Sequence, residues 1–571
     1  MHIADWIIVI LYFAYVLAEG FRHGKKNKNL DDYFRGKRSL RWWAVGLSVM
    51  ATQASAITYI GTTGQAYNAG MSFIQVYLPQ PLVMVILCMT FVPFFYRANV
   101  FTAYEYLERR FDAKTRSLTS FIFLISRGLA VSFVLYAPSI ILAVIFGWNE
   151  LITIMIMGVS TIIYTTIGGN KAVIMIDAKQ MLLMFAGIFI AIALFVSKFP
   201  AHYSIGDAVH LAGLEGKWNS IDLSMDLKNS YTLLSGMLGG FFLALSYFGC
   251  DQSQVQRYLT GRSLTESRMS LMLNAFLKVP MQFLILAVGV LMFVSYHFIK
   301  PPLNFSAADQ SVLMQKAGSR YTELEKKYDA VFQERRVEAL SLSEARKSHN
   351  AVALKAAEGR YREANAAFRE LKNENRALLK SVTGSEPSSE VNYIFPSFLI
   401  QHAPAGILGI MLAVIFAAAM SSFSSEINSL ASATIIDFYK RYFCKAAGDA
   451  HYLWVSRVAT LFWGAFATGA ACYAGKLGSL IEAVNKVGSY FYGPILGVFL
   501  LAFMVRRCNG TGAFYGLIAG EIAVFAVSYY SSISWLYYNV VGVAVVLAAG
   551  TAISMLRPSQ ADASRSGGIR Q

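Results

Sequence analysis

The sequence predicts an all-α membrane protein with about thirteen transmembrane helices. Of its 571 residues, 56% are apolar and only 15% are charged, whereas about 25% of the residues of a soluble protein carry charge. Its apolar runs reach the roughly 20 residues that a helix needs to cross a bilayer. The expected spans are residues 6–22, 42–68, 74–96, 118–147, 151–167, 173–197, 231–256, 270–298, 405–437, 451–474, 478–504, 511–529 and 534–556.

The basic residues predict which side of the membrane each end of the chain occupies. They gather in alternate short loops, above all in 22–41 and 97–116, and such loops face the cytoplasm of a cell inner membrane. The first apolar run, Trp6–Ala18, has no Lys or Arg before it, so we expect a retained helix and not a signal peptide. The N-terminus is then outside, and residues 557–571 form a cytoplasmic tail. The net charge of +16 belongs to loops beside membrane lipid, which argues against a nucleic-acid partner.

One polar segment, residues 307–389, separates the spans within 1–306 from those within 390–556. Its apolar residues recur at helical spacing, and the stretch Ser348–Asn350 divides it into two helices that would pack as a hairpin. The loop charges place this segment outside the membrane. Two interpretations are open: a solvated elaboration of a loop, or a docking surface for a protein partner or a second copy of the chain.

A face of small and hydroxylated residues on the ninth span is the strongest signal for a cation site. Ala418, Ser421, Ser422 and Ser425 follow the spacing i, i+3, i+4, i+7 and therefore share one side of a helix. Hydroxyl and freed carbonyl oxygens can hold Na⁺ inside a bilayer without a full charge. The alternative is plain helix packing by small residues.

Two spans carry small polar stretches that predict broken helices. The second span is polar at Thr52–Ser55 and is followed by Gly61 and Gly64, and the seventh combines Gly249 with the polar run Asp251–Gln254. Broken helices in corresponding positions of two halves mark the substrate and ion sites of transporters. Small residues in the second span are equally typical of close helix packing.

Charged residues within the expected spans are functional candidates, because charge is costly there. Asp177 is either an interfacial acid paired with Lys171 or Lys179, or a cation ligand or proton acceptor. Arg127 is expected to extend its guanidinium to the cytoplasmic edge, and pairing with a substrate anion is the alternative. Lys278 is a second residue that could pair with such an anion.

These stretches resemble the sodium:solute symporter family. The resemblance implies a LeuT-like core of two inverted five-helix repeats, formed by spans two to six and seven to eleven, with 307–389 as an extracytoplasmic helical insert. It also implies sodium-coupled symport by alternating access, closer to the multivitamin and monocarboxylate branch than to the sugar branch. The matching stretches are Ala51–Gly61, Thr102–Phe111, Gly168–Gln180, Asp251–Leu259 and Ala417–Asn428.

The same resemblance implies which residues bind Na⁺. The shared site would use the carbonyls of Ala51 and Ala54, the carbonyl of Ala418, and the hydroxyls of Ser421 and Ser422. Members that carry sialic acid have a second sodium site, and this chain has the matching residue types. The residues of that second site would be Asp177, Ser421, Ser424 and Ser425.

The substrate is less constrained than the ion. Sugar-carrying members have Glu-Gln where this chain has Ile57 and Thr58, so the pair that would hold sugar hydroxyls is absent. We therefore expect a small carboxylate, with a sugar or an amino acid as alternatives. The residues expected to line the substrate site are Thr58, Gln75, Tyr77, Ser246, Tyr247 and Lys278.

Two other functional classes compete with symport. A receptor that keeps the transporter fold but moves no solute would share all these motifs, and measured flux would separate the two. A membrane enzyme is disfavoured, because the spans contain no His-rich metal spacing and no nucleophile motif. The five cysteines are scattered, which predicts neither a disulfide framework nor a zinc site.

Overall fold

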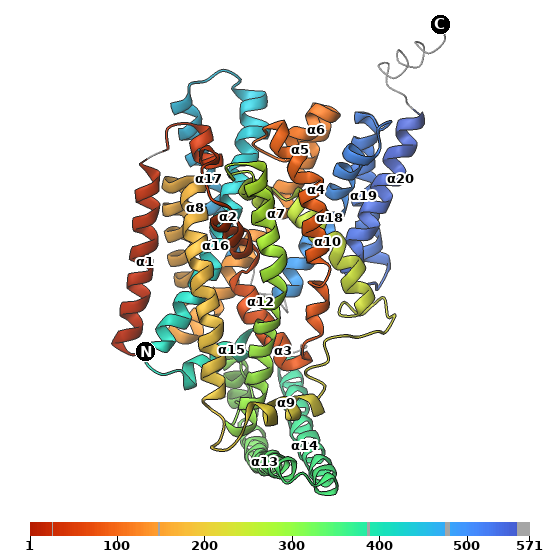
Figure 1. Cartoon of the computed structure of the whole chain (residues 1–571). Helices are drawn as coiled ribbons and strands as arrows, with labels where there is room; N and C mark the ends of the chain where they lie inside the picture. Colours follow the sequence, from red (N-terminus) through yellow and green to blue (C-terminus); the bar gives the residue numbers. More distant parts are fainter. Residues whose placement is uncertain (26, 147–148, 385–388, 474–479, 557–571) are drawn as a thin grey trace.

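The structure is a computed structural model that describes residues 1–25, 27–146, 149–384, 389–473 and 480–556, and over these it is built from helices (Figure 1). The predicted tail 557–571 lies outside the described residues. The longest helices are α1 (Ile3–Gly24), α7 (Ala113–Phe146), α8 (Glu150–Val196), α12 (Leu264–Phe298), α16 (Ile407–Ala433), α17 (Asp449–Ala471), α18 (Leu480–Met504), α19 (Gly510–Tyr530) and α20 (Leu536–Leu556). Shorter ones are α4 (Gln80–Met89), α5 (Phe91–Ala98), α6 (Tyr104–Arg110), α9 (Ile205–Leu214) and α15 (Val391–His402).

The thirteen expected spans all correspond to helices. Within the described residues, nine helical segments are individually long and apolar enough to cross a membrane, and one bent pair makes a tenth. Three further spans follow when α8 is divided at its kink and when the seventh span and α17 are counted. The prediction of an all-α membrane fold is therefore confirmed.

The second span is broken, as its polar middle predicted. Helix α2 (Trp42–Gln53) ends where Ala54 leaves helical geometry, with φ −88° and ψ 71°. The chain resumes in a π-helical turn, η3 (Thr58–Thr62), and in α3 (Thr63–Ala69). The two halves are bent by 64°, so carbonyls near the break are released from the helix ladder.

The seventh span is also broken, but two residues later than Gly249. It runs through η5 (Ser235–Gly239) and α10 (Gly240–Cys250), and Asp251 then adopts an extended conformation before α11 (Gln252–Tyr258) begins. The Asp251 carboxylate accepts a hydrogen bond from the Ser253 backbone N–H at 2.8 Å. Aspartate is among the best N-caps, because it satisfies a backbone donor that the new helix leaves free. The break therefore falls on the capping residue and not on the glycine.

The fifth and sixth spans form one continuous element, α8, with a kink at Gly169. This residue has φ +65°, a conformation that side chains rarely adopt, and a Cβ there would lie 2.9 Å from the backbone oxygen of Tyr33. The kink carries the second half of α8, with Asp177, toward the broken helix α2, which α8 contacts.

Helix α16 is the centre of the molecule. Every residue from Met411 to Ala433 is buried, and the helix contacts α1, α2, α7, α8, α11 and α17. A π-helical continuation, η6 (Thr434–Phe443), extends it. The serine face predicted from the sequence is thus enclosed by protein and does not face lipid.

The polar segment forms two long helices, α13 (Ala307–Lys347) and α14 (Ala351–Thr383), at the end of the molecule where the N-terminus lies (Figure 1). They are antiparallel and joined at His349, which has a left-handed φ of 53°. Arg346 holds the turn to Asp207 of α9 at 2.7 Å. His297 at the end of α12 and Tyr361 of α14 are 2.9 Å apart. The hairpin is therefore docked on the transmembrane helices.

Candidate functional site

The serine face of α16 meets the end of α2. The Ser421 hydroxyl donates to the Ala51 carbonyl at 3.2 Å and to the Ala418 carbonyl at 3.2 Å. The Ser422 hydroxyl lies 3.4 Å from the Ala51 carbonyl and 3.0 Å from the Thr52 carbonyl. Oxygen atoms from residues about 370 positions apart therefore converge inside the protein.

These oxygens fit a dehydrated Na⁺. Four of the five expected ligands, Ala51, Ala418, Ser421 and Ser422, have their oxygens in mutual contact. Ala54 lies at the break itself, where its N–H donates to Met50 and the helix ends. A hydroxyl turns its lone pairs to a cation as readily as it donates its proton to a carbonyl.

Asp177 pairs with neither Lys171 nor Lys179, so the interfacial interpretation is wrong. Its carboxylate accepts from Ser48 at 2.8 Å and from Ser425 at 3.3 Å, and it is fully buried. Lys171 donates to Ser39, and Lys179 pairs with Glu19 on the periphery. Of the second proposed ligand set, Asp177 and Ser425 are therefore in contact.

Ser424 is directed elsewhere. Its hydroxyl donates to the Ser421 carbonyl at 3.1 Å, and no bond from it to Asp177 is found among the described residues. Ser48, which donates to Asp177, and Thr52, which lies 3.0 Å from the Ser425 hydroxyl, join this cluster instead, and they are one helical turn apart on α2. Their i, i+4 spacing places them on one face of the helix, a pattern that was recognisable in the sequence but was not used to predict the site.

Arg257 of α11 is a second residue that the sequence reasoning did not single out. Its guanidinium lies 3.5 Å from the Asp177 carboxylate and donates to Thr52 at 2.6 Å. It also donates to the Ser425 hydroxyl. In this conformation the Arg257 guanidinium is the cation in contact with Asp177 and Ser425.

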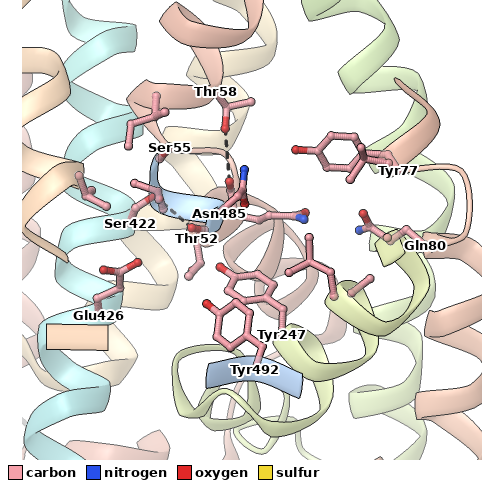
Figure 2. Close-up of a pocket in the computed structure, with 18 of the residues that line it drawn as sticks. Thr52, Ser55, Thr58, Tyr77, Gln80, Tyr247, Ser422, Glu426, Asn485 and Tyr492 are labelled. Atoms are coloured by element: carbon pink, nitrogen blue, oxygen red, sulfur yellow. Dashed lines mark hydrogen bonds between the residues drawn. The ribbon is translucent and has the colours of Figure 1, made fainter. Parts of the chain in front are cut away.

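A cavity of about 110 Å³ opens beside the break in the second span (Figure 2). Thr58 lies on one side, Tyr247 and Tyr492 together on another, and Tyr77 opposite Ser422 (Figure 2). Ser422 lines this cavity and also contacts the Ala51 carbonyl, so the cavity adjoins the residues predicted to bind Na⁺. Typical ligand pockets measure about 300–1,000 Å³, so the surrounding helices must part for most organic solutes to enter.

Arg127 is buried at the edge of this cavity and does not reach the membrane surface. Its guanidinium donates to Glu426 of α16 at 3.0 Å and also to Asp251, the residue at the second break. The side chain is 4% exposed. The expectation that it extends to the cytoplasmic edge is wrong, because two buried carboxylates hold it inside. Glu426, a carboxylate in mid-span, was detectable by the same rule that selected Asp177.

The sequence model of the sodium:solute symporter family matches residues 33–315 and 377–520. This match covers most of the chain and includes both broken helices, α16 and the cavity. The chain belongs to the sodium:solute symporter family. It is accordingly a multi-pass membrane transporter that couples solute movement to Na⁺, and not an enzyme.

Curated and solved relatives agree with this assignment. A sodium/sialic acid symporter of Proteus mirabilis is 27% identical over 96% of this chain and 94% of its own. A putative sodium-dependent multivitamin transporter of Drosophila melanogaster is 26% identical over 90% of this chain and 72% of its own. The substrate-bound, outward-open structure of a Na⁺-coupled sialic acid symporter superposes with a TM-score of 0.76 at 25% identity, covering 97% and 98% of the two chains. The symporter therefore has the LeuT-like fold that its motifs implied.

Three of the predicted substrate residues line the cavity of this symporter, and three do not. Thr58, Tyr77 and Tyr247 are among its lining residues. The amide of Gln75 instead bonds the backbone of Tyr231 at 2.7 Å and of Asp222 at 3.0 Å. Its role in the structure is to hold a loop.

Ser246 and Lys278 lie behind the cavity wall. Ser246 donates to the Tyr492 carbonyl at 2.5 Å and so supports a lining residue. Lys278 stands behind Tyr77, with its Nζ 5.3 Å from the centre of that ring. The sequence reasoning missed Gln80, Asn485 and Tyr492, which line the cavity, because isolated polar or aromatic residues within spans carry no distinctive spacing.

Proposed function

We propose that this symporter carries a small carboxylate and that Lys278 supplies the charge that selects it. The Lys278 ammonium is fully buried, and among the described residues it has no hydrogen-bond partner. An unpaired charge in a membrane span is costly, which favours a role in binding. The Lys278 Nζ lies 5.3 Å from the centre of the Tyr77 ring, which lines the cavity, and rotation of this ring would open the ammonium to a solute.

The other charges at the cavity support an anion as well. Arg127 is neutralised by Asp251 and Glu426, so it is not available to a solute carboxylate. Lys278 lies beside the lining residue Tyr77 and has no hydrogen-bond partner in the described part of the chain, so it can pair with a solute carboxylate. The names of the relatives point the same way, because sialic acid and the solutes of a monocarboxylate transporter of Mus musculus are carboxylates.

We further propose that two sodium ions accompany each solute. The first would be held by Ala51, Ala54, Ala418, Ser421 and Ser422. The second would be held by Asp177 and Ser425 with the hydroxyls of Ser48 and Thr52, and Ser424 would have to turn to join it. Because Arg257 contacts these oxygens, its guanidinium must withdraw when the second ion binds. The second ion and Arg257 would therefore compete for Asp177.

The orientation in a cell inner membrane follows from the loops. The hairpin α13–α14 and the N-terminus lie at one end of the molecule, whereas α5, α6 and the end of α20 lie at the other (Figure 1). The basic loops 22–41 and 97–116 belong to the second end, and the positive-inside rule assigns that end to the cytoplasm. The N-terminus and the hairpin would then be outside, and solute would move inward with the sodium gradient.

Transport in proteoliposomes tests the proposed solute class. With an inward sodium gradient, we expect uptake of small carboxylates and none of their amides. Lys278→Met should raise KM for the carboxylate at least tenfold, because the paired charge is lost. Lys179→Met is the matched control: this lysine also lies in a membrane helix, but it pairs with Glu19 away from the cavity, and its KM should stay near that of the parent.

Other outcomes would overturn the proposal in distinguishable ways. Sodium-driven uptake of a neutral sugar or a zwitterionic amino acid, unaffected by Lys278→Met, would establish one of the alternative substrates. Tight carboxylate binding with no uptake under any gradient would identify a receptor that keeps the transporter fold.

A further inference from the structure

A second, larger cavity lies between the helical hairpin and the outer ends of the transmembrane helices. It has a volume of about 520 Å³ and is bounded by α13, α14, the segment 303–305, and the end of α3 at Tyr67–Ala69. The family model does not match residues 316–376, which include most of the hairpin. This cavity is therefore a feature of this chain beyond the transport site shared by the family.

The walls of this outer cavity are basic. Its lining includes five basic and three acidic side chains, and one of each is consumed in the ion pair between Arg369 and Glu215. Four cations then face two carboxylates, so the cavity favours a negatively charged ligand. The remaining charged residues are Lys217, Arg335, Lys372 and Arg376, with Asp309 and Glu390.

Arg335 is the deepest of these cations. It is 3% exposed, its guanidinium lies 3.5 Å over the Phe368 ring, and one terminal nitrogen donates to the Tyr296 carbonyl at 2.6 Å. Its Nε has no partner among the described residues. A buried donor without an acceptor costs free energy, and a ligand oxygen in the cavity would satisfy it.

Amide side chains occupy the floor beside Arg335. Asn375 donates to Asn304 at 2.7 Å, but its own carbonyl oxygen has no donor among the described residues, although it is only 3% exposed. An acceptor beside unsatisfied cations suits a ligand that carries hydroxyl groups next to an anionic group. Asn365, also 3% exposed, lines the same floor.

Lys372 also lines the outer cavity and is half-buried. Its Nζ is 4.6 Å from the centre of the Phe305 ring, a cation–π contact. Burial lowers the pKa of Lys372 to about 8, against the opposing effect of Glu390, so it is charged at neutral pH. The faces of Phe305 and Phe368 offer apolar surface for the C–H groups of a ring.

We propose that this outer cavity is a second binding site, for a carboxylate that also carries several hydroxyl groups. Arg335 and Lys372 would pair with the carboxylate, and the asparagine amides would bind the hydroxyls. The site goes beyond the transport function, because neither Na⁺ nor Lys278 takes part in it.

The position of the outer site links it to the first broken helix. Lys217 donates to the Tyr67 carbonyl at 2.8 Å and also to the Asn68 carbonyl, and these are the last carbonyls of α3. A cation at a helix C-terminus stabilises that end. An anion bound beside Lys217 would compete with these carbonyls for the ammonium. Binding at the outer site would therefore alter the stabilisation of α3, the outer half of the broken span.

Equilibrium binding to the full chain in nanodiscs tests this proposal. The Lys278→Met variant is used in sodium-free buffer, so that the transport site contributes as little as it can. The probes are D-gluconate, D-glucuronate and N-acetylneuraminate, with D-glucose as the uncharged comparison. We expect at least one acid to bind saturably and glucose not to bind. Added Lys372→Met or Asn375→Asp should weaken that binding at least tenfold.

The control in this experiment is Arg360→Met. Arg360 lies on the same hairpin but pairs with Glu338 on its exposed side at 3.0 Å, so its removal should leave the affinity unchanged. The proposal is overturned if no acid binds saturably, if glucose binds equally well, or if Lys372→Met and Asn375→Asp bind the acids like their parent. None of these results depends on whether the chain transports a carboxylate.

Discussion

Ser425 takes part in two competing sets of contacts, and this sets the second proposed sodium site apart from the first. Its hydroxyl contacts Asp177 at 3.3 Å and also receives a hydrogen bond from Arg257. Ser422, in the first site, meets only uncharged oxygens. The first site should therefore bind Na⁺ without displacing another charge, whereas the second exchanges one cation for another.

A measurement of the coupling ratio tests this difference at single residues. We expect a ratio of two sodium ions per solute, read from reversal potentials in proteoliposomes. Ser425→Ala should lower the ratio to one, because it removes a ligand of the second ion only. Ser429→Ala should leave it at two, since that hydroxyl bonds only its own helix, at the Glu426 carbonyl. A ratio of one in the unaltered chain would exclude the second ion.

Single residues show where sequence reasoning succeeds and where it fails. The serine face of α16 was predictable, because its spacing is local and its partners needed no identification. Arg127 was not, because its partners Asp251 and Glu426 lie 124 and 299 positions away. A long side chain in a span either reaches the surface or finds a buried partner, and only the fold decides between them.

Among elements, Arg127 ties three helices together at the second break. It belongs to α7, Asp251 caps α11, and Glu426 belongs to α16. Removing one partner of a buried ion pair costs about 3–5 kcal/mol, because the other charge is left uncompensated. The tie should therefore matter more for the stability of the bundle than for its affinity.

Thermal unfolding in detergent tests this tie. Arg127→Met should lower Tm by several degrees, since it strands two carboxylates inside the protein. Glu426→Gln should lower it less, because Arg127 and Asp251 still neutralise each other. Equal losses in the two variants, or none in Arg127→Met, would show that the cluster does not hold these helices.

The elements themselves were largely predictable, and their breaks were less so. Apolar runs fix where helices cross the bilayer, because each run must be long enough regardless of its neighbours. The exact break in the seventh span depended on whether a glycine or a cap ended the helix, and Asp251 prevailed over Gly249 because it satisfies a backbone donor. The outline of the site followed from the family motifs, but the membership of Arg257 and Tyr492 required the packed structure.

For the whole molecule, the hairpin is held to the core through Asp207. This carboxylate pairs with Arg346 at 2.7 Å and with Lys347 at 3.6 Å. Burial alone would raise the pKa of Asp207, but hydrogen bonds from Ser204 and Arg346 outweigh it and lower the pKa to about 2. The ion pair is therefore fully present above about pH 4, and it is lost as the pH falls through about 2.

Hydrogen exchange at neutral pH tests this attachment. Asp207→Asn should speed exchange at the end of α13 and the start of α14, because the charge that holds their turn is gone. Ser204→Ala is the matched control: it removes the cap of α9 but keeps the carboxylate, so faster exchange should stay within α9. If both variants leave the hairpin equally protected, other contacts hold it.

The complete burial of α16 has a consequence for biogenesis. Helix α16 as a whole is apolar enough to cross a membrane, but its second half carries six serines and Glu426, whose polar groups would have few partners if the helix entered the bilayer alone. It does not have to, because α1, α2, α7, α8 and α11, five of the helices that surround it, precede it in the chain and leave the ribosome earlier. The helices that surround α16 are therefore synthesised before its serine-rich segment. Helix α16 can then pack directly against protein without first being exposed to lipid.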